Sequence, residues 1–155
     1  MVDETEFRDA YETLNATPCP FKKALFSTLC ACSRSERLYI GDREAIACRD
    51  PQAQQRCLLL TQRLRAAAQF ALKVTTVRGE LPHRKRMKVE TGGLLGLQAV
   101  VAPETQRPER VADVYALLDQ AQTRFERLDA LPYARIIREM AQFEPRRPRS
   151  RRARS

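Results

Sequence analysis

Residues 50–68 read DPQAQQRCLLLTQRLRAAA, and this stretch decides the fold because it predicts a long helix. Asp50 is a good N-cap, since its carboxylate can accept hydrogen bonds from unpaired backbone N–H groups, and proline is favoured at the first helical position. The residues that follow have high helix propensity. Apolar side chains recur along them at helical spacing, at Leu60, Leu64, Ala67 and Ala71. We therefore expect a helix from Pro51 to about Ala68 with one apolar face.

Three shorter segments precede this helix. Residues 3–15 carry Phe7, Tyr11 and Leu14 at helical spacing and predict a short amphipathic helix, which ends at the two prolines around Cys19. Residues 21–29 predict a second helix, followed by a loop at 30–33. Residues 37–50 alternate weakly in polarity around Gly41, and they fit either a short strand or a helical turn.

Beyond the central helix, β-type residues over 70–77 and the alternation of Met87, Val89 and Thr91 within 86–91 predict a β-hairpin. Three glycines, Gly92, Gly93 and Gly96, then indicate a tight or closely packed backbone. Helical stripes over 108–130 and 132–143 predict an antiparallel helical pair or a partner surface. The expected fold class is α+β: a helix-rich single domain over 1–144 with a small β-hairpin, a cysteine-rich module over 19–98, a C-terminal helical pair over 108–143 and a disordered arginine-rich tail over 145–155.

The net charge of +9 is concentrated in two patches. One patch is Arg84, Lys85, Arg86 and Lys88, and the other is the six arginines of the tail, Arg146, Arg147, Arg149, Arg151, Arg152 and Arg154. Such patches can bind phosphate, acidic lipid or an acidic protein, although a tail of this composition can also serve solubility alone. No stretch approaches the roughly 18 apolar residues of a membrane span. We therefore expect a soluble, cytoplasmic protein.

The cysteines are the main functional signal. All five lie within 39 consecutive residues, and the 98 residues after them contain none; they are Cys19, Cys30, Cys32, Cys48 and Cys57. An odd number of cysteines in a reducing compartment disfavours a disulfide framework and leaves free thiols or thiolate ligands.

Position distinguishes the five as candidate metal ligands. Cys30 and Cys32 form a close pair in a loop that can fold around a metal, and Cys19 lies in a proline-shaped loop. Cys48 precedes a helix N-terminus, whose dipole favours a thiolate. Cys57 belongs to the apolar stripe of the helix, so that it fits core packing as well as ligation.

The spacing favours an iron–sulfur cluster over zinc. Structural zinc sites usually have two tight Cys or His pairs, whereas this chain has one pair and scattered further cysteines, which favours a [4Fe–4S] cluster with zinc as the alternative. His83, the only histidine, is either an extra ligand or simply exposed.

Other functions have weaker signals. Gly92–Gly96 lacks the lysine and hydroxyl residue of a phosphate-binding loop, and the basic stretch near residue 85 lacks the aromatic residues typical of nucleic-acid binding. A basic module for nucleic acid or an acidic partner, with structural zinc or free thiols, is the second hypothesis. Thiol-based catalysis is the third, and an enzyme is the less favoured class.

The segments CPFKKALFSTLCACS, CRDPQAQQRC and LPHRKRMKVETGGLLGLQ together resemble a group of small, cysteine-rich, uncharacterised bacterial proteins over residues 19–98. The resemblance implies that the cysteines and the glycine segment belong to one module, and that a further cysteine replaces Thr91 in such proteins. Our leading hypothesis is a protein that binds an iron–sulfur cluster through four of the five cysteines and acts in electron transfer, redox sensing or partner regulation.

Overall fold

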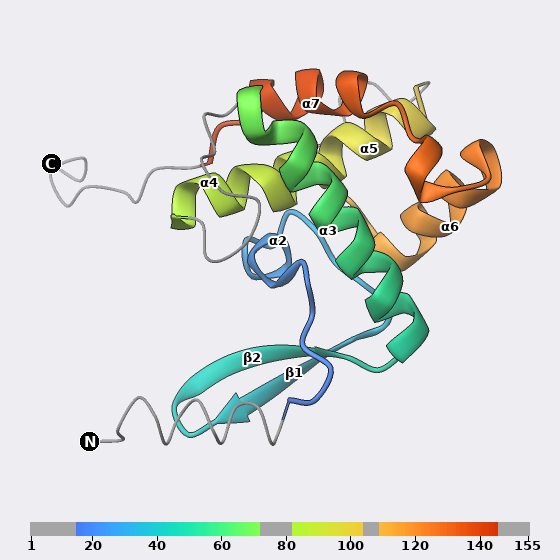
Figure 1. Cartoon of the computed structure of the whole chain (residues 1–155). Coiled ribbons are helices and arrows are strands. Elements are labelled where there is room, and N and C mark those ends of the chain that lie inside the picture. The colour runs from blue at the N-terminus through green and yellow to red at the C-terminus, as the bar shows by residue number, and fades with distance from the viewer. Residues whose placement is uncertain (1–14, 72–81, 104–108, 146–155) are drawn as a thin grey trace, which may run out of the picture.

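The computed structural model describes residues 15–71, 82–103 and 109–145. A β-hairpin occupies one end of the molecule, and helices form the rest (Figure 1). Strand β1 (Ser35–Ile40) pairs antiparallel with β2 (Arg43–Cys48), in a register that sets Ser35 opposite Cys48. The strands are joined by a two-residue loop at Gly41, whose φ of +63° is one that glycine adopts without steric penalty. Of the two structures that the sequence allowed over 37–50, the strand is therefore formed.

Helix α3 (Pro51–Ala71) is the long helix expected from its sequence. Asp50 Oδ1 accepts hydrogen bonds from the backbone N–H groups of Gln52 and Ala53, at 3.1 and 3.2 Å, as an N-cap does. Leu60 and Leu64 are fully buried. The start of the helix and the burial of Leu60 and Leu64 are confirmed, Ala67 is half-buried, and the side chain of Ala71 lies outside the described part of the structure.

The predicted hairpin over 70–77 and 86–91 is wrong in its second half. Residues 83–101 form one helical run: α4 (His83–Met87), a π-helical turn η1 (Lys88–Gly92) and α5 (Gly93–Val101). Val89, Glu90 and Thr91 are all buried, because this run is packed between α3 and α7 (Tyr133–Gln142), so the period-two alternation did not mark a strand face. In the first half, 70–71 end α3 and 72–77 lie outside the described residues.

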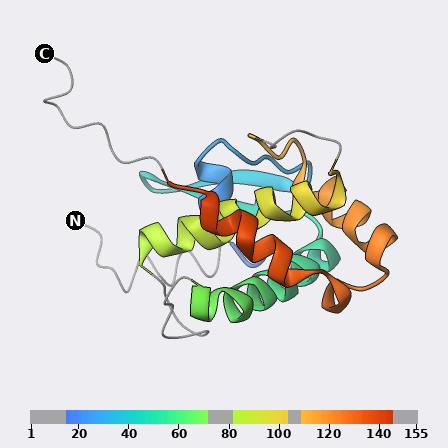
Figure 2. The same ribbon diagram turned by 90° about the horizontal axis from the view of Figure 1, so that it is seen from above.

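The three glycines permit close helix packing, as their spacing indicated. A Cβ atom at Gly96 would lie 2.7 Å from the backbone oxygen of Ile136 in α7, and one at Gly93 would lie 2.8 Å from the side chain of Leu64. Figure 2 shows α5 and α7 crossing at close range beside α3. A side chain at Gly96 would push α5 and α7 apart, because the atom in its way belongs to the backbone.

The two C-terminal helices are present but do not pack mainly on each other. Helix α6 (Val114–Phe125) is followed by a short 3-10 turn η2 (Leu128–Ala130), and α7 packs chiefly against α5 and α3. Their predicted stripes are largely buried, including Leu118, Ile136 and Met140 at 0% exposure. The expected antiparallel pair is therefore corrected to a layer in which α5 lies between α6 and α7.

Near the N-terminus, the helix predicted over 21–29 is the shorter α2 (Lys22–Phe26), and the helix predicted over 3–15 lies outside the described residues. Buried side chains from α2, α3, α5, α6 and α7 form one core cluster, so the α+β class with a small hairpin and C-terminal helices is confirmed. None of the described helices is both long enough and apolar enough to cross a membrane.

Candidate metal centre

Four of the five cysteines line one small cavity between the hairpin end of the molecule and α3. They are Cys19, Cys32, Cys48 and Cys57, and they come from the loop before α2, the loop before β1, the end of β2 and the second turn of α3. The cavity has a volume of about 20 Å³, close to the space of one water molecule, and its other walls include Phe21, Leu25, Ala47 and Val114. Residues that are up to 38 positions apart within the cysteine region thus line one cavity.

Backbone pairing brings Cys19 and Cys48 together. The segment before α2 lies antiparallel against β2: Cys19 N–H donates to the carbonyl of Ile46 at 2.9 Å, and Cys48 N–H donates to that of Thr17 at 2.7 Å. Prolines on both sides of Cys19 restrict this segment to an extended form, since proline fixes φ. The segment therefore behaves as a short third strand that holds one cysteine beside another.

Two further contacts bring in Cys32 and Cys57. A tight turn, in which Ser35 N–H and Oγ both donate to the carbonyl of Cys32, sets Cys32 at the start of β1, and Ser35 is the register partner of Cys48. Cys57 projects from α3, two turns after its N-cap at Asp50. The sequence left Cys57 between core packing and ligation, and the structure places it with the other three.

The ionisation of Cys19, Cys32 and Cys57 is influenced by the neighbouring cysteines of the cavity, Cys48 among them. Burial, reinforced by these neighbours, raises the pKa of Cys19 and of Cys57 to about 12, and it raises the pKa of Cys32 as well. Such thiols are protonated at neutral pH and are poor nucleophiles. A bound cation would compensate the charge of the corresponding thiolates and so favour their formation.

Three of the sulfurs share a local contact with the backbone two residues further on. A backbone hydrogen bond from Phe21 acts on Cys19 and one from Arg34 acts on Cys32, each lowering the thiol pKa against the larger effect of burial. Cys48 Sγ donates to the carbonyl of Asp50 at 3.1 Å. Hydrogen bonds to cysteine sulfur tune metal–sulfur centres, and the bonds at Cys19 and Cys32 are of this kind. The bond at Cys48 has the opposite direction, since the thiol donates its proton, and it would be lost in a thiolate.

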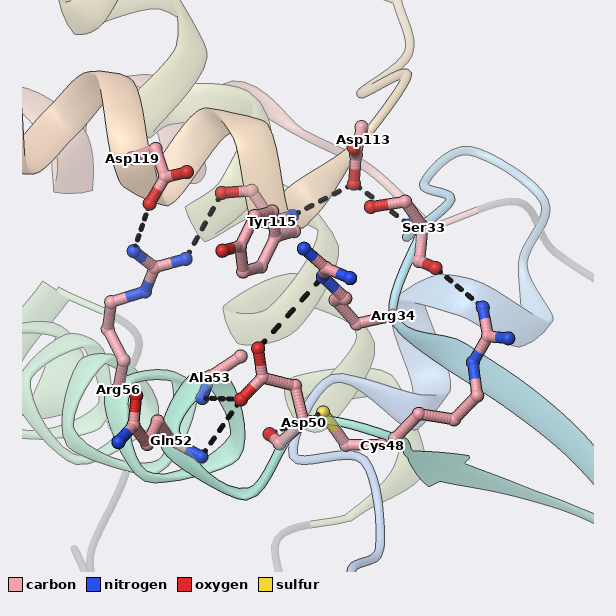
Figure 3. A network of polar contacts seen from close by, with 11 residues as sticks. Ser33, Arg34, Cys48, Asp50, Gln52, Ala53, Arg56, Asp113, Tyr115 and Asp119 are labelled. Atoms are coloured by element: carbon pink, nitrogen blue, oxygen red, sulfur yellow. Dashed lines mark hydrogen bonds and ion pairs between the residues drawn. The ribbon is translucent and has the colours of Figure 1, made fainter.

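Two arginines and a tyrosine cover the cavity. Arg34, Arg56 and Tyr115 all line it, and the guanidinium carbons of Arg34 and Arg56 lie 4.3 and 5.1 Å from the centre of the Tyr115 ring. Figure 3 shows Tyr115 between the two guanidinium groups. Arg34 Nε is 4.0 Å from Asp50 Oδ2, so the N-cap of α3 also holds this cover in place. The two positive charges would stabilise a negatively charged group in the cavity.

Cys30 and His83 are not part of this arrangement. Cys30 is 3% exposed and packs in the core, where its loop is bonded to residue 111 through Ala31 N–H and Val111 N–H. Burial raises the pKa of Cys30 to about 12, and none of the other cysteines contributes to that shift. His83 is exposed at the start of α4. The close Cys30–Cys32 pair thus does not act as a pair, since only Cys32 reaches the cavity.

The thiols surround the cavity without meeting as ligands of one ion would. Among residues 15–71, 82–103 and 109–145, no group of three or more His, Cys, Asp or Glu side chains is arranged to hold a metal ion. Any centre bound here would therefore require the thiols to turn toward it.

The basic patch near residue 85 is partly neutralised within the chain, where two carboxylates pair with three of its four cations. Arg84 and Lys88 both bind Glu144, at 3.0 and 3.2 Å, and Arg86 Nε binds the buried Glu90 at 2.6 Å. Glu90 in turn accepts hydrogen bonds from the first N–H groups of α2. Lys85 also has an interaction within the chain, and the six arginines of 146–154 lie outside the described residues. The patch therefore contributes to internal structure more than its sequence indicated.

Sequence reasoning missed the cover of Arg34, Arg56 and Tyr115. Arg34 and Arg56 lie within two residues of a cavity cysteine, which is a usable signal in hindsight, whereas Tyr115 belongs to a helix far along the chain and has none. Comparison with known proteins found no matching family model, curated protein or solved structure.

Proposed function

We propose that the chain binds an iron–sulfur cluster of the [4Fe–4S] type through Cys19, Cys32, Cys48 and Cys57, and that it acts in electron transfer, redox sensing or regulation of a protein partner. The observation that carries the proposal is the meeting of these four thiols, and of no other cysteine, at one apolar cavity. Four cysteines are the usual ligand set of such clusters. Cys30 is the fifth, structural cysteine.

The separation of the thiols favours a cluster over a single zinc ion. Four thiolates at about 2.3 Å from one zinc ion must approach each other to roughly 3.8 Å, and the described side chains offer no such group. In a cluster each thiolate binds a different iron atom, so the four sulfurs can remain further apart around a shared volume. Zinc is the alternative outcome of the metal analysis.

The surroundings suit a negatively charged metal–sulfur centre. Apolar side chains form much of the wall, the backbone bonds at Cys19 and Cys32 act on sulfur, and the Arg34 and Arg56 guanidiniums supply positive charge. Because the cavity of about 20 Å³ is small, binding requires the thiols to rotate and the cover to shift outward. A reducing, cytoplasmic location would keep the free thiols available.

The decisive experiment is purification of the full chain without oxygen, followed by iron, acid-labile sulfide and zinc analysis with a visible absorption spectrum. We expect about four iron and four sulfide per chain. A folded, colourless protein without iron or sulfide would refute the proposal, and stoichiometric zinc would assign the site to the alternative.

Cysteine variants identify the ligands. Cys32→Ala should lower the iron content at least tenfold relative to the wild type, because it removes one of four ligands. Cys30→Ala is the matched control: it lies two residues away, loses about 1–2 kcal/mol of stability through the small void in the core, and should keep its iron. Equal iron in the two variants would contradict the assignment.

A further inference from the structure

The hairpin uses the backbone groups of its two strands in opposite directions. In an antiparallel pair the N–H and C=O of one residue point to the same side, and successive residues alternate between the two sides. On β2, the carbonyl of Ile46 and the N–H of Cys48 bond to residues 17–19, on the side away from β1. Ala45 and Ala47 therefore turn their backbone groups toward β1, and the residues of β1 that face them complete the hairpin.

Strand β1 consequently has an unpaired outer edge. Glu36 and Leu38 are the register partners of those two alanines and use their backbone groups within the hairpin. Arg37 and Tyr39 lie between and after them, so their N–H and C=O groups point away from β2. Within the described part of the chain no group forms a hydrogen bond with these backbone atoms. An edge of this kind can accept a further strand.

The side chains of β1 do little to block such pairing. The strand contains neither a proline nor a bulge, which commonly protect an edge. The charge of Arg37 is offset by Glu44, whose Oε1 lies 2.6 Å from Arg37 Nη1. Tyr39 is 73% exposed, and the partly exposed ring of Phe26 lies 5.6 Å from the Arg37 guanidinium carbon. The edge thus combines unpaired backbone with exposed aromatic surface.

The sequence of β1 is complementary to a second copy of itself in one antiparallel register. Residues with outward-facing backbone groups must face each other, so Arg37 and Tyr39 pair with the same two positions of the copy. With Arg37 opposite Tyr39, a guanidinium group lies beside an aromatic ring and Leu38 faces Leu38. A shift in one direction sets Arg37 opposite Arg37, and a shift in the other direction sets Arg37 opposite the loop at Gly41. Both shifted registers lose the favourable pairs.

We propose that β1 is a dimerisation edge, which pairs antiparallel with β1 of a second copy of this chain so that Arg37 faces Tyr39 at two symmetric positions. The two hairpins then form one continuous sheet, which is favoured because an isolated two-stranded hairpin has little stability of its own. Such an interface uses the same surface on both copies, as a two-fold dimer requires. The inference does not depend on a bound metal.

The test is sedimentation velocity of the metal-free full chain over a range of concentrations, for the wild type, Tyr39→Arg and Leu58→Arg. Tyr39→Arg places a cation opposite Arg37 of the second copy, whereas within its own hairpin it stands opposite Glu44. We expect the dissociation constant of the dimer to rise by about tenfold or more. Leu58→Arg is the matched control, because it makes the same charge change at an exposed apolar position of α3 and should dimerise as the wild type does.

A charge swap and amide hydrogen exchange locate the interface. The double variant Arg37→Glu/Tyr39→Arg sets opposite charges at the facing positions and should dimerise more tightly than Tyr39→Arg. In the wild-type dimer the amides of Arg37 and Tyr39 should exchange more slowly than in the dilute monomer. The amides of Glu36 and Leu38 are already bonded within the hairpin and should change less.

Three results would overturn the inference: a wild-type chain that stays monomeric, a dimer weakened equally by Tyr39→Arg and Leu58→Arg, or a dimer in which the amides of Arg37 and Tyr39 gain no protection. Thermal unfolding in dilute solution separates loss of the dimer from loss of the fold, and Tyr39→Arg should unfold close to the wild-type temperature. If that variant fails to fold, the exchange measurement on the wild type decides the question.

Discussion

At the scale of single residues, five identical side chains have two different roles because their surroundings differ. Cys30 turns into the main core, while the other four line one cavity. Burial is the dominant cause of the raised thiol pKa values in both places. The distinction between a cavity cysteine and a core cysteine is therefore one of geometry, and chemical type alone does not reveal it.

The raised thiol pKa values predict how the metal-free chain responds to alkali. The pKa of Cys19 and of Cys57 is about 12 in the folded chain against an ordinary value of 9.0, so the folded state holds these protons more tightly. Their contribution to stability is present below about pH 9 and is lost as the pH rises toward about 12. Urea unfolding at about pH 8 and about pH 10.5 should show this loss.

Cys19→Ala is the matched variant for this measurement, since other groups such as Tyr133 also titrate in alkali with a raised pKa. The variant should lose less stability than the wild type over the same pH interval. An identical loss in the two proteins would argue against a raised pKa at Cys19.

At the scale of elements, close packing of α5 against α7 depends on glycine. The Cβ atom of an alanine at Gly96 would meet the backbone oxygen of Ile136, which cannot move without displacing α7. At Gly93 the nearest atom is the end of the Leu64 side chain, which can rotate. An added methyl group at Gly96 would therefore have to displace backbone, whereas one at Gly93 would have to displace only a side chain.

We predict that Gly96→Ala destabilises the chain by about 1–3 kcal/mol, because overpacking against backbone exceeds the roughly 1 kcal/mol gain in helix propensity. Gly93→Ala should be closer to neutral. Chemical denaturation of both variants measures the difference. A Gly96→Ala variant that is as stable as the wild type would show that α5 and α7 are not held at this distance.

At the scale of the whole molecule, the cavity lies where the hairpin end and its loops contact α3 and the start of α6. Three of its cysteines belong to the hairpin end and its adjoining loops, and the fourth belongs to α3, which leads into the helical core. A centre bound by all four would tie the hairpin end to that core (Figure 1). Binding to the folded state alone also stabilises it by mass action.

Cluster loading should therefore slow amide hydrogen exchange in β1 and β2 more than in α7, whose contacts are with α5 and α3. The comparison is between iron-loaded and metal-free full chain, and Cys32→Ala treated in the same way serves as the control. The link between the hairpin and α3 would be contradicted if loading slowed amide exchange equally in all elements, or if it did not slow exchange in the two strands.

Local sequence determined the elements whose signals are local. The Asp50 cap, the proline after it and the helical stripe at Leu60 and Leu64 act within a few residues, and α3 forms as they predict. The helices near the C-terminus follow for the same reason. Clustering of the cysteines in sequence likewise limited the candidate metal ligands to residues 19–57.

Tertiary structure alone decided the rest. Residues 86–91 are helical. This helix is packed on several sides, so that consecutive residues are buried, and the period-two spacing of Val89 and Thr91 therefore does not indicate a strand. The choice of Cys57 over Cys30, and the cover formed by Tyr115, depend on which segments fold against each other. Those contacts are made between residues that are distant in the chain. Their energy comes from burial and charge in the folded molecule, and a local sequence pattern does not encode such contacts.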